Sequence, residues 1–132
     1  MQERWNGVDE ALSEFSRFLA HDFPKLELQH LYDFEMTDEE YQLSRKAKSA
    51  IYNLPGVYLF YDKSGSLLYI GKASWTFDKR VWKHPEIVDA KYIDVIPFDW
   101  ATSSFCMALE YFLISKLRPN YNKHGRDYDY PE

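Results

Sequence analysis

The feature of this sequence that most constrains its fold is a change of hydrophobic period at Gly56. Two apolar runs follow, 57–61 and 66–70, and the polar segment 62–65 joins them. Short runs rich in aromatic and branched residues, separated by a turn that ends in glycine, are typical of a β-hairpin. The sequence therefore predicts a hairpin as the first part of a β-sheet.

Helix and strand patterns follow this hairpin. A short helix is expected at about 76–83, a strand at about 91–96 and a longer helix at about 103–117. Thr102 or Ser103 is the expected N-cap of the last helix, because a hydroxyl at that position accepts a bond from a free backbone N–H group. Hairpin, helix, strand and helix together predict a small α+β fold.

The first part of the chain has helical periodicity. Apolar residues recur at helical spacing over about 8–20, where Asn6 is the expected N-cap. A second helix is expected over about 37–53, because Thr37 is followed three positions later by a glutamate, as in a capping box. The connecting segment, 23–34, is too apolar for a free linker. We therefore expect two helices that pack on the rest of the protein.

Charge divides the chain into two parts. Residues 1–50 carry six basic and eleven acidic side chains, a net charge of −5, whereas the remaining residues carry ten of each sign. Phosphate binding favours a basic surface, so the total charge argues against a nucleic-acid enzyme. The excess of acidic residues lies in the first part, however, and the segment 72–91 has five basic and three acidic residues. We expect an acidic helical extension, 1–53, packed on a domain, 54–132.

Cysteine content and hydropathy limit the cellular setting. Cys106 is the only cysteine, which excludes an internal disulfide and favours a reducing compartment. No apolar run approaches the roughly 20 residues that a membrane helix needs, and the start lacks a signal-peptide pattern. The expectation is a cytoplasmic protein without a membrane partner.

Glu110 is the most informative single residue. Its neighbours three and four positions away on the expected helix are all apolar: Cys106, Met107, Leu113 and Ile114. A carboxylate in such surroundings must be paired with a cation, protonated or bound to a metal. The helix pattern alone favours an ion pair with a basic residue.

Two strings on the hairpin, Gly56-Val57-Tyr58 and Tyr69-Ile70-Gly71, are followed in order by Arg80, Glu110 and Asn122. Either string alone is a weak signal, because glycine and tyrosine are common in strands and turns. Their order and spacing resemble the GIY-YIG nuclease superfamily over about 54–122. The region looks most like the nuclease domain of the excision-repair incision subunit. The resemblance implies a three-stranded antiparallel sheet flanked by helices.

The resemblance also implies a metal and a reaction. The family places a glutamate at Glu110 as the sole protein ligand of a divalent cation, and one carboxylate with several waters suits Mg²⁺ or Mn²⁺. The implied reaction is endonucleolytic hydrolysis of DNA phosphodiester bonds by one-step in-line attack of water, with RNA not excluded as a substrate. Asn122 would orient groups of the site, although it could equally be a turn residue.

A further set of residues would handle the phosphate and the water. Arg80 is expected to hold the scissile phosphate, with Lys79 as its rival in register. Tyr58 and Tyr69 would position and activate water, with help from Lys72. The pKa of a free tyrosine is about 10, so such a role at neutral pH needs positive charge nearby.

Several alternatives remain open from the sequence. His84 is a secondary candidate for proton transfer or phosphate binding, and a surface histidine is an equal interpretation. Each tyrosine taken alone fits simple sheet packing. A non-catalytic module that binds nucleic acid or protein is the rival function. The acidic extension is a possible surface for a protein partner, and it could restrain activity by repelling DNA.

Overall fold

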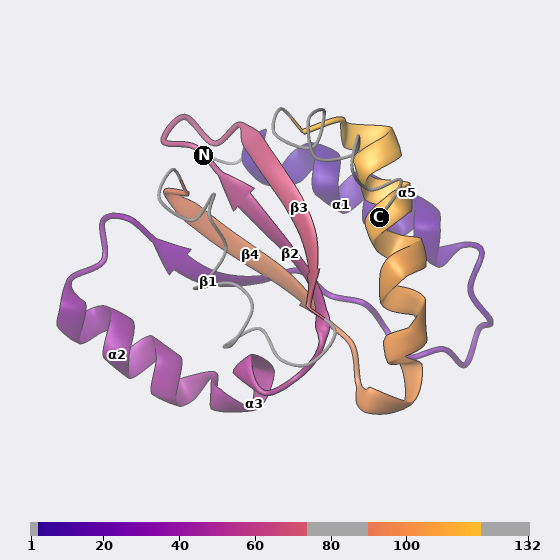
Figure 1. The fold of residues 1–132 in the computed structure, drawn as a ribbon, viewed down its shortest axis with the longest axis horizontal. Coiled ribbons are helices and arrows are strands. Elements are labelled where there is room, and N and C mark those ends of the chain that lie inside the picture. The colour runs from indigo at the N-terminus through magenta and orange to yellow at the C-terminus, as the bar shows by residue number, and fades with distance from the viewer. Residues whose placement is uncertain (1–2, 74–89, 120–132) are drawn as a thin grey trace.

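A computed structural model describes residues 3–73 and 90–119 (Figure 1). In chain order, the elements are α1 (Glu3–Ser16), β1 (Gln29–Asp33), α2 (Asp38–Ala47), α3 (Ser49–Tyr52), β2 (Gly56–Tyr61), β3 (Leu67–Ala73), β4 (Tyr92–Pro97), the 3₁₀ helix η2 (Trp100–Phe105) and α5 (Cys106–Leu117). The helix expected at 76–83 lies outside the described residues. In the part that is described, no helix has both the length and the apolar character needed to cross a membrane.

The sheet has four antiparallel strands in the order β1-β4-β2-β3. The predicted α+β class is confirmed, but the expected count of three strands is wrong. The additional strand is β1, which comes from the extension and pairs with β4, with a bulge between His30 and Tyr32. The extension therefore contributes to the sheet as well as packing on it.

The hairpin turn between β2 and β3 is organised by one carboxylate. The Asp62 side chain accepts hydrogen bonds from the backbone N–H groups of Ser64 and Ser66, and Gly65 takes a positive φ of 92°. Partial burial acts to raise the pKa of the Asp62 carboxyl, but these hydrogen bonds outweigh it and hold the pKa below its ordinary value. The turn thus fixes the register that aligns the two tyrosine strings.

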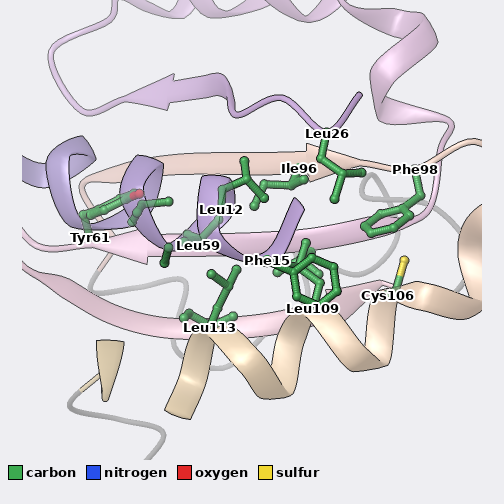
Figure 2. Close-up of a cluster of buried hydrophobic side chains, with 14 of the residues drawn as sticks. Leu12, Phe15, Leu26, Leu59, Tyr61, Ile96, Phe98, Cys106, Leu109 and Leu113 are labelled. Atoms are coloured by element: carbon green, nitrogen blue, oxygen red, sulfur yellow. The ribbon is translucent and has the colours of Figure 1, made fainter. Parts of the chain in front are cut away.

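One face of the sheet is covered by α1 and α5 (Figure 1). Their apolar side chains meet those of β2 and β4 in the larger of two buried clusters (Figure 2). Five buried members of this cluster come from the extension: Val8, Ala11, Leu12, Phe15 and Leu26. At about 25 cal/mol per Å² of apolar surface, this burial is a substantial part of the stability of the domain.

The opposite face carries a second buried cluster that is rich in aromatic side chains. Its members include Leu31 of β1, Tyr52 of α3, Tyr58 and Phe60 of β2, and Tyr69 of β3. The alternation of side chains along a strand explains the division, because Val57 and Leu59 of β2 belong to the first cluster. Both faces of β2 are therefore buried, which matches its unbroken apolar sequence.

Helix ends differ from the predictions in two places. The Thr37 capping box is present at α2, as predicted, but the helix divides at Lys48 into α2 and α3. Because α1 begins at Glu3, Asn6 lies inside the helix and the prediction of Asn6 as an N-cap is wrong.

The start of the last helix also differs from the prediction. A 3₁₀ helix precedes α5, and its N-cap is Asp99, whose carboxylate accepts from the Thr102 backbone N–H at 2.9 Å. The capping role predicted for Thr102 or Ser103 is therefore wrong, because the helical turn starts earlier than the apolar periodicity does.

Candidate active site

Tyr58 and Tyr69 lie on the same face of the hairpin. Tyr69 is directly opposite Phe60 in the ladder, and the ring centroids of the two tyrosines are 6.1 Å apart. Phe60 packs against both rings. Tyr58 is 0% exposed and Tyr69 is 8% exposed. The side-by-side placement expected from strand pairing is present, but both rings are packed in the interior of the aromatic cluster.

Gly71 provides the space for the Tyr58 ring. The two residues are partners in the β2–β3 ladder. A β-carbon added at Gly71 would lie 2.7 Å from Cε1 of Tyr58 and closer still to Cζ and Oη. Real β-carbons do not approach other atoms so closely, so only glycine fits here. The glycine of the second string is thus required by the tyrosine of the first.

By the strand register, Lys72 belongs to the face of the sheet opposite the one that carries Tyr58 and Tyr69. It is the ladder partner of Val57, which belongs to the cluster that contains Leu109 and Leu113 of α5. Lys72 is half-buried and so is Glu110 on α5. Met107, one helical turn before Glu110, is 48% exposed. The prediction that Glu110 has only apolar, shielded neighbours is therefore corrected: it lies at the margin between core and solvent.

The charges of Lys72 and Glu110 both act on the Cys106 thiol. Burial raises the pKa of this thiol to about 11, the positive charge of Lys72 acts to lower it, and the negative charge of Glu110 acts to raise it. Both charges therefore lie close enough to Cys106 to influence its ionisation. Lys72 and Glu110 lie on two elements that contact each other, β3 and α5.

The backbone register directs the tyrosine pair and Lys72 to opposite faces of β3. Because β3 is at the end of the strand order, the two groups are separated only by the edge of the sheet. A substrate that binds at this edge would meet Lys72 and the small exposed part of Tyr69, but not the covered Tyr58 ring. Arg80, His84 and Asn122 lie outside the described residues, so their predicted roles stay predictions.

Comparison with known proteins relates this chain to one named protein. It is 38% identical over 87 residues to UvrABC system protein C of Flavobacterium johnsoniae. This match covers 55% of this chain and 14% of that protein. It is 32% identical over 96 residues to the protein of the same name from Clostridium botulinum, covering 66% of this chain and 15% of that protein. The match thus takes in a small part of the length of these curated relatives. No protein-family profile matches the chain.

Among solved structures, the chain is similar to the GIY-YIG N-terminal endonuclease domain of UvrC from Thermotoga maritima bound to magnesium as its catalytic divalent cation. The identity is 27%, the match covers 66% of this chain and 99% of that chain, and the TM-score is 0.46. The likeness rests on the sequence relationship and the ordered strings. A tyrosine variant of the Thermotoga domain gives a TM-score of 0.45 at 26% identity.

Few groups in the described part of the chain could hold a metal ion. Within 3–73 and 90–119, no three histidine, cysteine, aspartate or glutamate side chains come together as a metal cluster. A half-buried carboxylate at the core margin, such as Glu110, fits an ion that keeps most of its waters. Of the predicted site residues that are described, Glu110 is the one acid.

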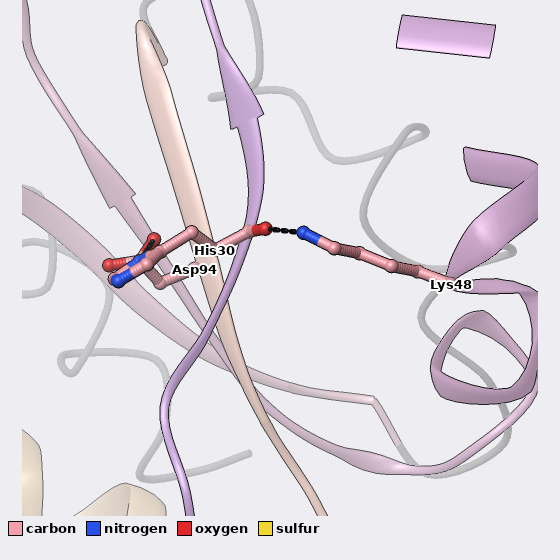
Figure 3. Close-up of polar contacts among 3 residues, drawn as sticks. All are labelled: His30, Lys48 and Asp94. Carbon is pink, nitrogen blue, oxygen red and sulfur yellow. Dashed lines mark hydrogen bonds and ion pairs between the residues drawn. The ribbon is translucent and has the colours of Figure 1, made fainter. Parts of the chain in front are cut away.

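One buried polar pair was missed by the sequence interpretation. Asp94 is fully buried in β4, and its Oδ1 lies 2.7 Å from Nδ1 of His30 in β1 (Figure 3). The Lys48 ammonium donates to the His30 carbonyl and so fastens the α2–α3 junction to the same strand. An aspartate inside an otherwise apolar strand was the signal, because a buried carboxylate needs a partner.

Proposed function

We propose that this GIY-YIG domain is a metal-dependent endonuclease that hydrolyses DNA phosphodiester bonds by one-step in-line attack of water. The observation that supports the proposal most is the packing of α5, which carries Glu110, against β3, which carries Lys72, on a chain related to UvrABC system protein C. A carboxylate and a cation on two packed elements suit a centre that must hold a divalent ion and bind an anion.

In this proposal Glu110 holds Mg²⁺ or Mn²⁺ as the only protein ligand. When bound, the ion stabilises the negative charge that develops on the leaving oxygen. The Lys72 ammonium attracts the phosphate and favours the ionised form of a nearby hydroxyl. Arg80 would grip the phosphate with its planar fork, and Asn122 would support these groups.

The water would be positioned from the tyrosine face. Tyr69 is the better placed of the two phenols to meet substrate, because a small part of it is exposed on the edge strand whereas Tyr58 is fully covered. Tyr58 would orient the Tyr69 ring, which it contacts. His84 is an additional candidate for moving the proton of the water.

The rival function, a non-catalytic module that binds nucleic acid or protein, is favoured by one observation. A phenol as deeply buried as that of Tyr58 cannot contact water without movement of its neighbours. The acidic extension remains the proposed surface for a protein partner, because its net charge of −5 disfavours DNA.

A plasmid-nicking assay tests the proposal. Supercoiled DNA is incubated with the protein in Mg²⁺, in Mn²⁺ or in EDTA, and the wild type is compared with Glu110→Gln and Glu27→Gln. Glu110→Gln is expected to lower the nicking rate at least about 100-fold, because a sole metal ligand supplies several kcal/mol to the transition state. Glu27 is exposed on the extension, so its variant should cut normally.

Arg80→Lys keeps the charge but loses the fork, and it should cut about 10-fold more slowly with little change in DNA affinity. Nicking by Glu110→Gln at the wild-type rate would show that the metal assignment is wrong. If the folded wild type binds DNA but does not cut it with any divalent ion, the binding-module function is the correct one.

A further inference from the structure

A basic hollow lies at the junction of α2 and α3. Its volume is about 420 Å³, and its polar lining consists of Gln42, Arg45, Lys46, Ser49 and Asn53. Among the described residues that line it, none carries a carboxylate. Three of the six basic residues of the otherwise acidic extension occur at 45–48. Positive charge is therefore concentrated at one place on a segment whose net charge is negative.

Arg45 is held in position by an aromatic ring. Its guanidinium carbon lies 5.0 Å from the centre of the Tyr52 ring, and Tyr52 is buried in the same cluster as Tyr58 and Tyr69. A cation over a fixed ring loses little further freedom when it binds an anion. Lys48, by contrast, binds the His30 carbonyl and so fixes the junction (Figure 3).

The helix dipole explains only part of this arrangement. Asp38, Glu39 and Glu40 lie in the first turn of α2, and Arg45 and Lys46 lie in its last turn, as the dipole favours. The dipole does not require a hollow between two helices, nor the amide and hydroxyl groups that α3 adds to it. These groups and the two cations are what a phosphate site uses.

The hollow lies near the end of the sheet that carries the second string. Asn53 precedes Gly56 by three residues, a span of at most about 11 Å. Gly56 is the ladder partner of Ala73, about 5 Å away and next to Lys72. The backbone of the hollow is thus within about 16 Å of Ala73. A single DNA strand covers this distance with roughly five nucleotides, at about 3.4 Å per nucleotide.

We propose that this hollow binds backbone phosphates of the DNA strand a few nucleotides from the phosphate that is cut. The inference rests on the proposed nuclease function, and it deepens that function by giving the extension a role in substrate binding. The site reads no sequence, because phosphates carry no base information. It also accounts for how a protein with a net charge of −5 binds a polyanion.

Equilibrium binding in EDTA, where no cutting occurs, tests the hollow separately from catalysis. The probe is a fluorescent DNA duplex of about 20 base pairs, titrated over a salt series. The test variant is Arg45→Gln/Lys46→Gln. The matched control is Arg17→Gln/Lys25→Gln, which removes two exposed charges elsewhere on the extension. The single change Lys46→Glu leaves the Arg45–Tyr52 packing intact. Weaker binding by this variant therefore cannot result from loss of that packing.

The double variant is expected to bind about 10-fold more weakly at low salt, and its slope of log affinity against log salt should fall by about 1.8, or about 0.9 per lost phosphate contact. Lys46→Glu should weaken binding in the same direction, and the control should stay near the wild type. Equal slopes for the test and control variants would overturn the site. If the test variant binds DNA more weakly but the wild type does not nick DNA, the phosphate site is supported and the nuclease function is contradicted. If the wild type nicks DNA but the test variant has an unchanged salt slope, the nuclease function is supported and the phosphate site is contradicted.

Discussion

The ring of Tyr58 covers the backbone of Gly71, at the place where any other residue would put a β-carbon. The two strings that carry the family resemblance are therefore one packing unit across the β2–β3 ladder. A tyrosine in the first string needs a glycine in the second, for steric reasons that do not depend on catalysis. Substitution of either residue measures how much these two strings contribute to the stability of the fold.

Gly71→Ala should lower the free energy of unfolding by about 1–3 kcal/mol, because the new methyl group would overlap the Tyr58 ring. Gly7→Ala is the matched control. A β-carbon at Gly7 would lie 3.6 Å from Leu117 Cδ2, an ordinary contact, and alanine favours the α1 helix. Urea unfolding measures both variants. If Gly71→Ala is as stable as the wild type, the Tyr58 ring is not confined as the structure shows.

His30→Ala should destabilise the protein by about 1–3 kcal/mol, because the buried Asp94 carboxylate would lose a hydrogen bond. Lys25→Ala is the control, since it breaks only the exposed Lys25–Glu27 pair and should change stability by less than about 1 kcal/mol. Denaturant midpoints at constant pH compare the two. Equal effects of the two substitutions would contradict a structural role for the His30–Asp94 pair.

Stability should fall between about pH 9 and pH 11 because of Cys106. Folding raises the pKa of this thiol from 9.0 to about 11, so the folded state holds a proton that the unfolded state has already lost. The contribution is fully present below pH 9 and disappears as the pH passes 11. A shift of about two units sets an upper bound of about 2–3 kcal/mol on this contribution, because solvent screening reduces it.

Unfolding curves at a series of pH values measure this effect as a difference between variants. Cys106→Ala should flatten the decline between pH 9 and pH 11, whereas Ile114→Val, a mild packing change on the same helix, should keep the wild-type slope. If the free energy of unfolding of Cys106→Ala falls as steeply as that of the wild type, groups other than Cys106 cause the decline.

The sequence predicts the elements whose signals are local. The hairpin is specified by the runs on either side of Gly65, and the start of α2 by Thr37 and Glu40, which bond to each other's backbone N–H groups. β1 was not predicted as a strand because its short sequence is mixed in polarity and it forms only against β4. A strand that depends on a distant partner leaves little local pattern.

The same distinction applies to the site. Cross-strand pairing was enough to place Tyr58 and Tyr69 together. The deep burial of Tyr58 was not predictable, since it depends on packing from elements far away in sequence. Glu110 was selected by its apolar helical neighbours and by resemblance, and Lys72 by resemblance. The contact between their elements, α5 and β3, emerges only from the structure. The α2–α3 hollow was missed because the predicted helix had no break at Lys48.

Removal of residues 1–53 should abolish the cooperative thermal transition and cause aggregation. The reason is that the extension supplies five buried side chains of the larger cluster and the strand β1. The charge-based hypothesis, that the acidic extension restrains DNA binding, is tested without this damage by Asp38→Asn/Glu39→Gln, which leaves the Thr37 capping box intact. If restraint operates, this variant binds DNA more tightly at low salt; unchanged affinity across the salt series would contradict it.

The pairing of β1 with β4 also sets an order of events during folding. Its hydrogen bond between His30 and Asp94 joins positions 64 residues apart, whereas β2 and β3 are joined by a short turn. On a ribosome, β1 emerges long before its partner exists, while the hairpin can form as soon as it is exposed. We expect the sheet to grow outward from the hairpin and to close last at β1. Until that closing step, the nascent chain depends on slow loop closure, or on a chaperone, to shield its open edge.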